Sequence, residues 1–238
     1  MKKINFIAAL LVISFTLLHA DVYIKQKTNM GAFMGQPPKE LIQEYWLGKN
    51  KMALISREQS MILDIETKKL YMVIHSSKSY IETGLPLDMT KVMPEQMAQM
   101  MKGMLDGMTI SVQANGQTKK VANWNANGYD LKITVMGMEI KMVFWASKDV
   151  PFDWKEYSYL YSEIYKAQFN VGEKFMEEFK KVQGFPVETE VDAMGMKATT
   201  TTVEISQKKP AAGTYSVPAG YTKKDKLSEQ DLQNKTNF

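Results

Sequence analysis

The chain has 238 residues, a formal net charge of +4 and 45% hydrophobic residues, enough to bury the core of one domain or at most two. It contains no cysteine, which excludes a disulfide framework, a thiol nucleophile and a thiolate metal site. Its basic residues are almost all lysines scattered along the chain, so the sequence predicts no nucleic-acid partner.

The N-terminus has the pattern of a secretory signal peptide. Lys2 and Lys3 precede an apolar run at 4–18, and the small residue Ala20 follows it. The run is too short and too close to the terminus for a convincing transmembrane span. We therefore expect residues 1–20 to be cleaved and the protein to reside in the periplasm. Loss of the two lysines lowers the formal charge from +4 to +2.

From residue 21 the sequence alternates between apolar and polar positions in short runs separated by polar turns. Such runs predict strands, and turn signals about 8–12 residues apart are typical of antiparallel sheets. The expected strands are 21–30, 42–47, 52–57, 61–65, 70–75 and 79–83.

A methionine-rich segment at 89–108 predicts an amphipathic helix. Asp88 and Pro94 supply helix start signals. The methionines that recur three or four residues apart, and so share one helix face, are Met89, Met93, Met97, Met101, Met104 and Met108, with Met100 beside them. Because methionine is flexible and polarizable, such a face either fills gaps in a core or lines a groove for apolar ligands of variable shape.

Four further strands are expected at 109–113, 120–126, 129–136 and 138–146. Asn115-Gly116 and Asn127-Gly128 have the residues that hairpin turns favour. In the last strand the alternation places four apolar residues on one buried face, and we include them in the expected ligand-binding surface. They are Met138, Ile140, Met142 and Phe144.

The remainder of the chain changes period twice. Residues 149–183 follow helical spacing, with an interruption near 170–172 and Gly184 as the stop. Strands resume at 185–193 and 197–206, and residues 226–238 are expected to form a polar, unfolded tail. The whole is a mainly β (α+β) chain of about eleven strands and two or three helices, which favours an antiparallel sheet with helices on one face.

Three segments resemble the LolA/LolB/LppX-like periplasmic proteins and the uncharacterised families grouped with them. They are Glu-Tyr-Trp-Leu-Gly-Lys-Asn-Lys-Met at 44–52, Met-Ile-Leu-Asp-Ile-Glu-Thr-Lys-Lys-Leu-Tyr at 61–71 and Gly-Thr-Tyr-Ser-Val-Pro-Ala-Gly-Tyr at 213–221. The resemblance covers 21–225 and implies a curved half-barrel sheet wrapped around its helices. It also implies carriage of a lipid or acyl chain, with transient contact to a membrane or a lipoprotein. Arg57, the only arginine, does not match the arginine that closes the plug in LolA, so the lipoprotein-carrier role does not transfer.

The sequence also contains residues that other chemistries would use. Met136-Gly-Met138 and Met194-Gly-Met196 have thioether spacings suited to Cu(I), although both triplets also suit hairpin turns. His75, the sole histidine after residue 20, makes neither a metal site nor a triad alone. No paired carboxylates, phosphate loop or nucleophile elbow occurs.

We therefore expect a monomeric, non-catalytic lipid-binding protein with no cofactor and no assigned metal site. The alternatives are a methionine-based Cu(I) or metal-binding protein, and a structural or interaction module whose groove is filled by its own helix.

Overall fold

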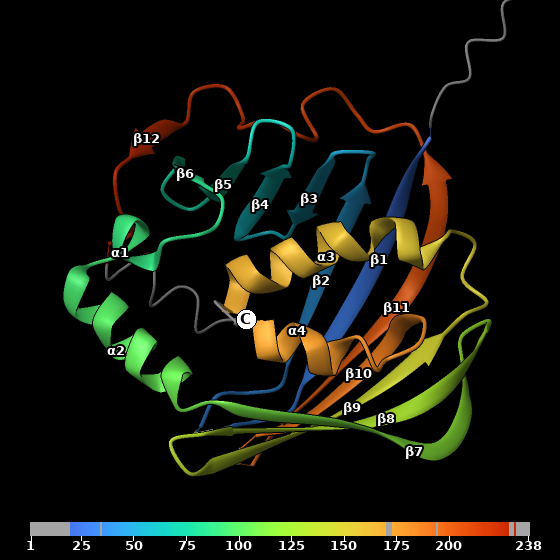
Figure 1. Cartoon of the computed structure of the whole chain (residues 1–238). Helices are drawn as coiled ribbons and strands as arrows, with labels where there is room; N and C mark the ends of the chain where they lie inside the picture. The colour runs from blue at the N-terminus through green and yellow to red at the C-terminus, as the bar shows by residue number, and fades with distance from the viewer. Residues whose placement is uncertain (1–19, 34, 170–172, 194, 229–230, 232–238) are drawn as a thin grey trace, which may run out of the picture.

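The computed structural model describes residues 20–33, 35–169, 173–193, 195–228 and 231 (Figure 1). The signal peptide expected at 1–20 lies outside this part of the chain, apart from Ala20. The strands of the first half are β1 (Asp21–Met30), β2 (Lys39–Leu47), β3 (Lys51–Ile55), β4 (Gln59–Asp64), β5 (Lys69–Ile74) and β6 (Ser79–Gly84). Those of the second half are β7 (Thr109–Val121), β8 (Trp124–Val135), β9 (Met138–Ser147), β10 (Phe185–Ala193), β11 (Met196–Lys208) and β12 (Thr222–Lys224).

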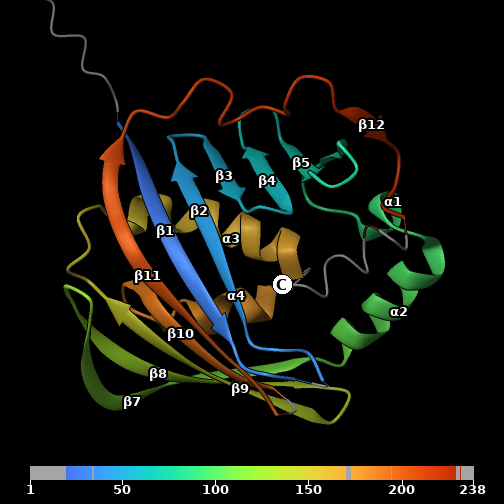
Figure 2. The same cartoon turned by 180° about the vertical axis from the view of Figure 1, so that it is seen from behind.

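All twelve of these strands form one sheet, in the order β12-β6-β5-β4-β3-β2-β1-β11-β10-β9-β8-β7. Neighbouring strands are antiparallel, except that β12 runs parallel to β6. The sheet is open and curved, and its helices lie on the concave side (Figures 1 and 2). The predicted fold class is therefore confirmed.

The helices are α1 (Met89–Val92), α2 (Glu95–Asp106), α3 (Trp154–Phe169) and α4 (Glu173–Phe179). The single helix expected at 89–108 is divided between α1 and α2. Met93 has extended backbone angles, φ −139° and ψ 167°, because the ring of Pro94 disfavours a helical conformation at the residue before it. The proline that we interpreted as a start signal also ends the preceding turn.

The prediction of hairpin turns at Asn115-Gly116 and Asn127-Gly128 is wrong, because the first pair lies inside the long strand β7 and the second inside the long strand β8. Asn115 Nδ2 donates to Asp130 Oδ1 at 2.8 Å, and Asn115 Oδ1 accepts the Gln117 N–H at 3.0 Å. These bonds hold the irregularity between Ala114 and Thr118 as a bulge. A Cβ at Gly128 would overlap the Asn115 side chain, so glycine is needed there for close approach.

Three apolar clusters stabilise the sheet. The α3 cluster joins buried concave residues of β1–β6, such as Ile24 and Leu63, to Val92 of α1 and Leu160 of α3, and it extends to Trp145 of β9. The α4 cluster packs α4 against β7–β9 and consists of Val112, Tyr129, Leu131, Phe144, Ala146, Phe179 and Val182. The outer cluster lies on the convex side, where Tyr215, Val217 and Tyr221 cover Ala53, Ile62 and Val73.

The C-terminal segment packs beside α1 at Leu227, which lies within the range 226–238 expected to form a polar tail. Leu227 is 2% exposed, and its backbone N–H donates to the Val92 carbonyl at 2.8 Å. Lys224 Nζ lies 3.0 Å from a carboxylate oxygen of Asp231. Leu227 is a single apolar residue in a polar stretch, and it is enough to pack this stretch beside α1. A prediction from the average composition of 226–238 overlooks such a residue. The remaining residues of 226–238 lie mostly outside the described part of the chain.

Candidate ligand-binding face

Helix α2 lies across the open side of the curved sheet, between α1 beside β6 and the start of β7 (Figures 1 and 2). Its methionines at 97, 101 and 104 are partly exposed, and Met100 is 59% exposed. Met93 and Met89 differ from them, because Met93 is 1% exposed and Met89 packs against the α3 cluster. The predicted methionine stripe is therefore divided into a packed part on α1 and a half-open part on α2.

The other predicted site residues lie near the β7–β9 end of the concave face. Met108, Met142 and Phe144 belong to the α4 cluster or pack against it. Ile140 is half-buried, whereas Met138 is 41% exposed beside the turn that joins β8 and β9. The structure thus brings three of these residues together under α4 and leaves two nearer the rim.

Helix α4 is anchored on this end of the sheet by one ring and one carboxylate. The rings of Phe179 and Phe144 meet edge-to-face with centroids 5.5 Å apart. Glu178 Oε2 accepts the Val112 N–H at 2.9 Å on the edge strand β7. The ion pair with Lys181 and this backbone N–H hold the pKa of Glu178 below its usual range. A ligand that reached Met142 or Phe144 would have to compete with α4.

A row of uncharged polar side chains crosses the middle of the concave face, and we call it the polar belt. Its members, on β1, β2, β10 and β11, are Gln26, Thr28, Gln43, Thr189, Thr200 and Thr202. They face the helices because Gln26 and Thr28 continue the alternation of the buried Val22 and Ile24. Gln43 and Thr200 are their cross-strand partners, and Thr189 in turn pairs with Thr200.

Two hydrogen bonds connect the polar belt across the β1–β11 seam. Gln26 Nε2 donates to Thr202 Oγ1 at 3.1 Å, and the hydroxyls of Thr28 and Thr200 lie 2.8 Å apart. Thr202 is fully buried, whereas the other belt members are half-buried. Our sequence reading missed the belt because it followed only the apolar residues of that face. The alternation in β1 could have found it.

A groove of about 480 Å³ lies where the bulged part of β7–β8 meets the chain just beyond α4. Its lining is mixed, with Ala114, Asn127 and Tyr129 from the strands and Lys181 and Gln183 from the other side. The groove therefore offers hydrogen-bonding groups as well as apolar surface.

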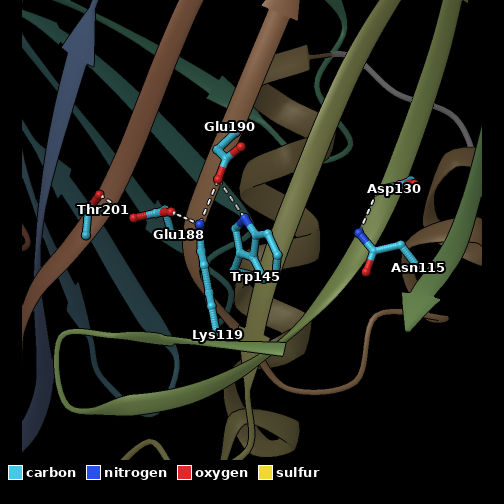
Figure 3. Close-up of polar contacts among 7 residues, drawn as sticks. All are labelled: Asn115, Lys119, Asp130, Trp145, Glu188, Glu190 and Thr201. Carbon is cyan, nitrogen blue, oxygen red and sulfur yellow. Dashed lines mark hydrogen bonds and ion pairs between the residues drawn. The ribbon is translucent and has the colours of Figure 1, made fainter. Parts of the chain in front are cut away.

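The convex side carries a connected polar network that fastens the tip of the β7–β8 hairpin (Figure 3). Lys119 Nζ contacts Glu188 Oε1 at 2.5 Å and Glu190 Oε1 at 2.7 Å, and lies 4.0 Å from the Trp145 ring centroid. Trp145 Nε1 donates to Glu190 at 2.8 Å, and Thr201 donates to Glu188 at 3.0 Å. Burial alone would raise the pKa of Glu190, but hydrogen bonds from Lys119 and Trp145 outweigh it and lower the pKa. These bonds are suited to a structural role, and we call the network of Lys119, Trp145, Glu188, Glu190 and Thr201 the clasp.

His75 forms a second link, which involves the C-terminal segment. Its Nε2 lies 2.8 Å from Ser60 Oγ, and its Nδ1 lies 2.9 Å from the Tyr221 hydroxyl. Burial lowers the pKa of His75. Across the described residues, no three side chains among histidine, cysteine, aspartate and glutamate gather as a metal site would need. The helices of that same part of the chain are too short or too polar to cross a membrane.

Comparison with solved structures gives distant likenesses. Two structures of PNGF-II, in C2 and P21 space groups, match 90% and 91% of this chain at 8% and 9% identity, with TM-scores of 0.42 and 0.44. The chain spans about a third of their length, 32% and 33%. The LolA superfamily protein NE2245 from Nitrosomonas europaea matches 83% of this chain and 90% of its own at 9% identity, with a TM-score of 0.33. TM-scores below 0.5 carry no argument about function.

The family comparison is more definite. No curated protein matches the chain. The model of the domain of unknown function DUF4412 matches residues 40–221, which include every strand from β3 to β11 and all four helices. This chain belongs to the DUF4412 family.

Proposed function

We propose that this protein binds a lipid or another long apolar ligand on the concave face of its sheet, in the periplasm and without catalysing a reaction. The observation that carries the proposal is the position of α2, whose partly exposed methionines lie across the open side of the sheet. A methionine face that served only as core filler would be buried as Met93 is.

Burial of apolar surface supplies the binding energy. An acyl chain gains about 0.8 kcal/mol for each CH₂ group removed from water, so about ten buried groups contribute about 8 kcal/mol. Part of this is lost to the entropy cost of association. Such a site selects ligands by length and shape. This protein acts as a monomer and takes up its ligand during transient contact with a membrane or a lipoprotein. The exposed Met136 and Met138 offer apolar contacts at the rim of the sheet.

Native mass spectrometry of protein purified from the periplasm tests the proposal. We expect a co-purified lipid of defined mass, and we expect Met97→Asp, Met101→Asp and Met104→Asp, combined in one variant, to abolish it, because three carboxylates on the apolar wall must be desolvated. The control is Gln99→Asp, an exposed position on the opposite side of α2. Wild-type protein that is apo and takes up no added lipid contradicts the proposal.

A second candidate function is Cu(I) binding by thioethers. The observation that favours it is the proximity of the two Met-Gly-Met turns, since Ile140 of β9 pairs with Ala193 and Ala193 pairs with Met196. Met136 and Met138 are exposed on the first turn, while Met194 of the second lies outside the described residues. Thioether clusters select Cu(I).

Titration of the apo protein with Cu(I) distinguishes this candidate. A stoichiometric complex that is lost in the Met136→Leu, Met138→Leu double variant and retained in Met100→Leu supports it. Protein that takes up neither lipid nor Cu(I) is a structural module whose groove is filled by its own helices.

A further inference from the structure

We propose that the polar belt binds the head group of an amphiphilic ligand, and that this head group is uncharged and carries hydroxyl or amide groups. The inference rests on the proposed function, since it concerns one end of a ligand whose apolar part lies on the concave face. It assigns a role to Gln26, Thr28 and Thr200, which form no part of the methionine surface.

The belt lies between two apolar zones of the same face. On one side are Ile24 and Tyr45, in or against the α3 cluster. On the other side an apolar cross-strand row runs through Met30, Ala198, Val191, Met142, Leu131 and Val112. This row ends in the α4 cluster. A ligand with its polar end on the belt could therefore lay its chain along the half-buried part of this row, from Met30 to Val191, before α4 covers the surface at Met142.

The belt has hydrogen-bonding capacity beyond its internal bonds. Two threonine hydroxyls hold two donors and four acceptor lone pairs, and the bond between Thr28 and Thr200 uses one of each. The Gln26 carboxamide has two N–H donors and an acceptor oxygen, and its bond to Thr202 uses one donor. Donors and acceptors are thus both present on half-buried side chains, as recognition of hydroxyl or amide groups requires.

The charge of the wall decides which head groups fit. On β1, β2, β9, β10 and β11, the concave positions of the described chain hold one charged residue, Lys39, at the end of β2. Lys39 pairs with Met30, and the cross-strand rows of Gln26 and Thr28 hold no charged residue. A phosphate or carboxylate bound in those rows would therefore lose hydration without gaining an opposite charge beside it, which is costly. A neutral head group exchanges its hydrogen bonds with water for bonds to the belt.

A series of ligands with one tail and three head groups tests the inference. Delipidated protein is titrated by native mass spectrometry with 1-monooleoylglycerol, methyl oleate and sodium oleate, which share the oleoyl chain. Two hydrogen bonds that only the glycerol ester can donate should favour it over methyl oleate by about tenfold. Gln26→Leu with Thr200→Val should reduce this ratio to near one while methyl oleate still binds, which also shows that the variant is folded.

The matched control is Thr199→Val, the neighbouring residue on β11, whose side chain lies on the convex side. It should preserve the tenfold preference. Equal binding of the glycerol and methyl esters to wild-type protein overturns the head-group inference and leaves apolar binding intact. A preference for oleate overturns the requirement for an uncharged head group. Failure of all three ligands to bind overturns the proposed function itself.

Discussion

Replacing Phe179 by alanine should loosen α4 from the sheet, and the structure allows the size of the effect to be worked out. Phe179 is 9% exposed and meets Phe144 edge-to-face. Large-to-small changes of buried phenylalanine cost about 3–5 kcal/mol, and the lower end applies here because Phe179 lies at the end of a seven-residue helix. For a chain of this size a loss of about 3 kcal/mol lowers Tm by about 6–12 °C.

The assay is a double-mutant cycle followed by urea and thermal unfolding. Phe179→Ala and Phe144→Ala together should cost about 1 kcal/mol less than the sum of the single changes, because each single change already removes the ring pair. Ile42→Ala, at a 39% exposed position, should cost less than about 0.5 kcal/mol. Losses that add without coupling, or a loss below about 1 kcal/mol for Phe179→Ala, would refute the anchoring of α4 by this ring pair.

Three further predictions concern the links around the sheet. Because burial lowers the pKa of His75, the folded protein favours the neutral imidazole. The contribution of His75 to stability is complete above the unfolded pKa of about 6.5, and it is lost as the pH falls from there through the lower pKa of the folded state. Thermal melts near neutral pH and at about pH 5 should therefore differ more for wild type than for His75→Gln. Lys119→Met leaves Glu188 and Glu190 without their cation and should cost about 1–2 kcal/mol in urea unfolding, with a smaller loss in concentrated salt; an unchanged midpoint would show that the clasp contributes nothing. Leu227→Ala should cost about 2–3 kcal/mol if the end of the chain is packed as described, and no loss would mean that it is not.

The strand pattern was predictable where alternation and burial agree. In β1 the apolar positions 22 and 24 fix both the strand and the face that it buries. The hairpin prediction in β7–β8 failed because Asn-Gly is a local signal, whereas the bond from Asn115 to Asp130 across the strands decides the geometry. Local residue types cannot distinguish a turn from a bulge when the deciding contact lies on another strand.

The candidate site was predictable only in part, for a similar reason. Helical spacing placed the methionines on one face, but it could not say what lies opposite that face. Helix α4 covers Phe144 and Met142, and it begins about seventy residues after α2. No residue pattern within β9 predicts that α4 covers this strand. The polar belt could have been predicted from the sequence, since Gln26 and Thr28 occupy the same alternating positions as Val22 and Ile24.

The central place of β1 has a consequence for how the chain is made. One of the two neighbours of this strand is β11, which lies far along the chain, and the Gln26–Thr202 bond spans 176 residues. Until β11 arrives, β1 is an open edge, and until Tyr215 and Tyr221 arrive the outer cluster is uncovered. During folding both surfaces must be kept from other proteins, because an unpaired strand edge and an uncovered apolar cluster favour aggregation.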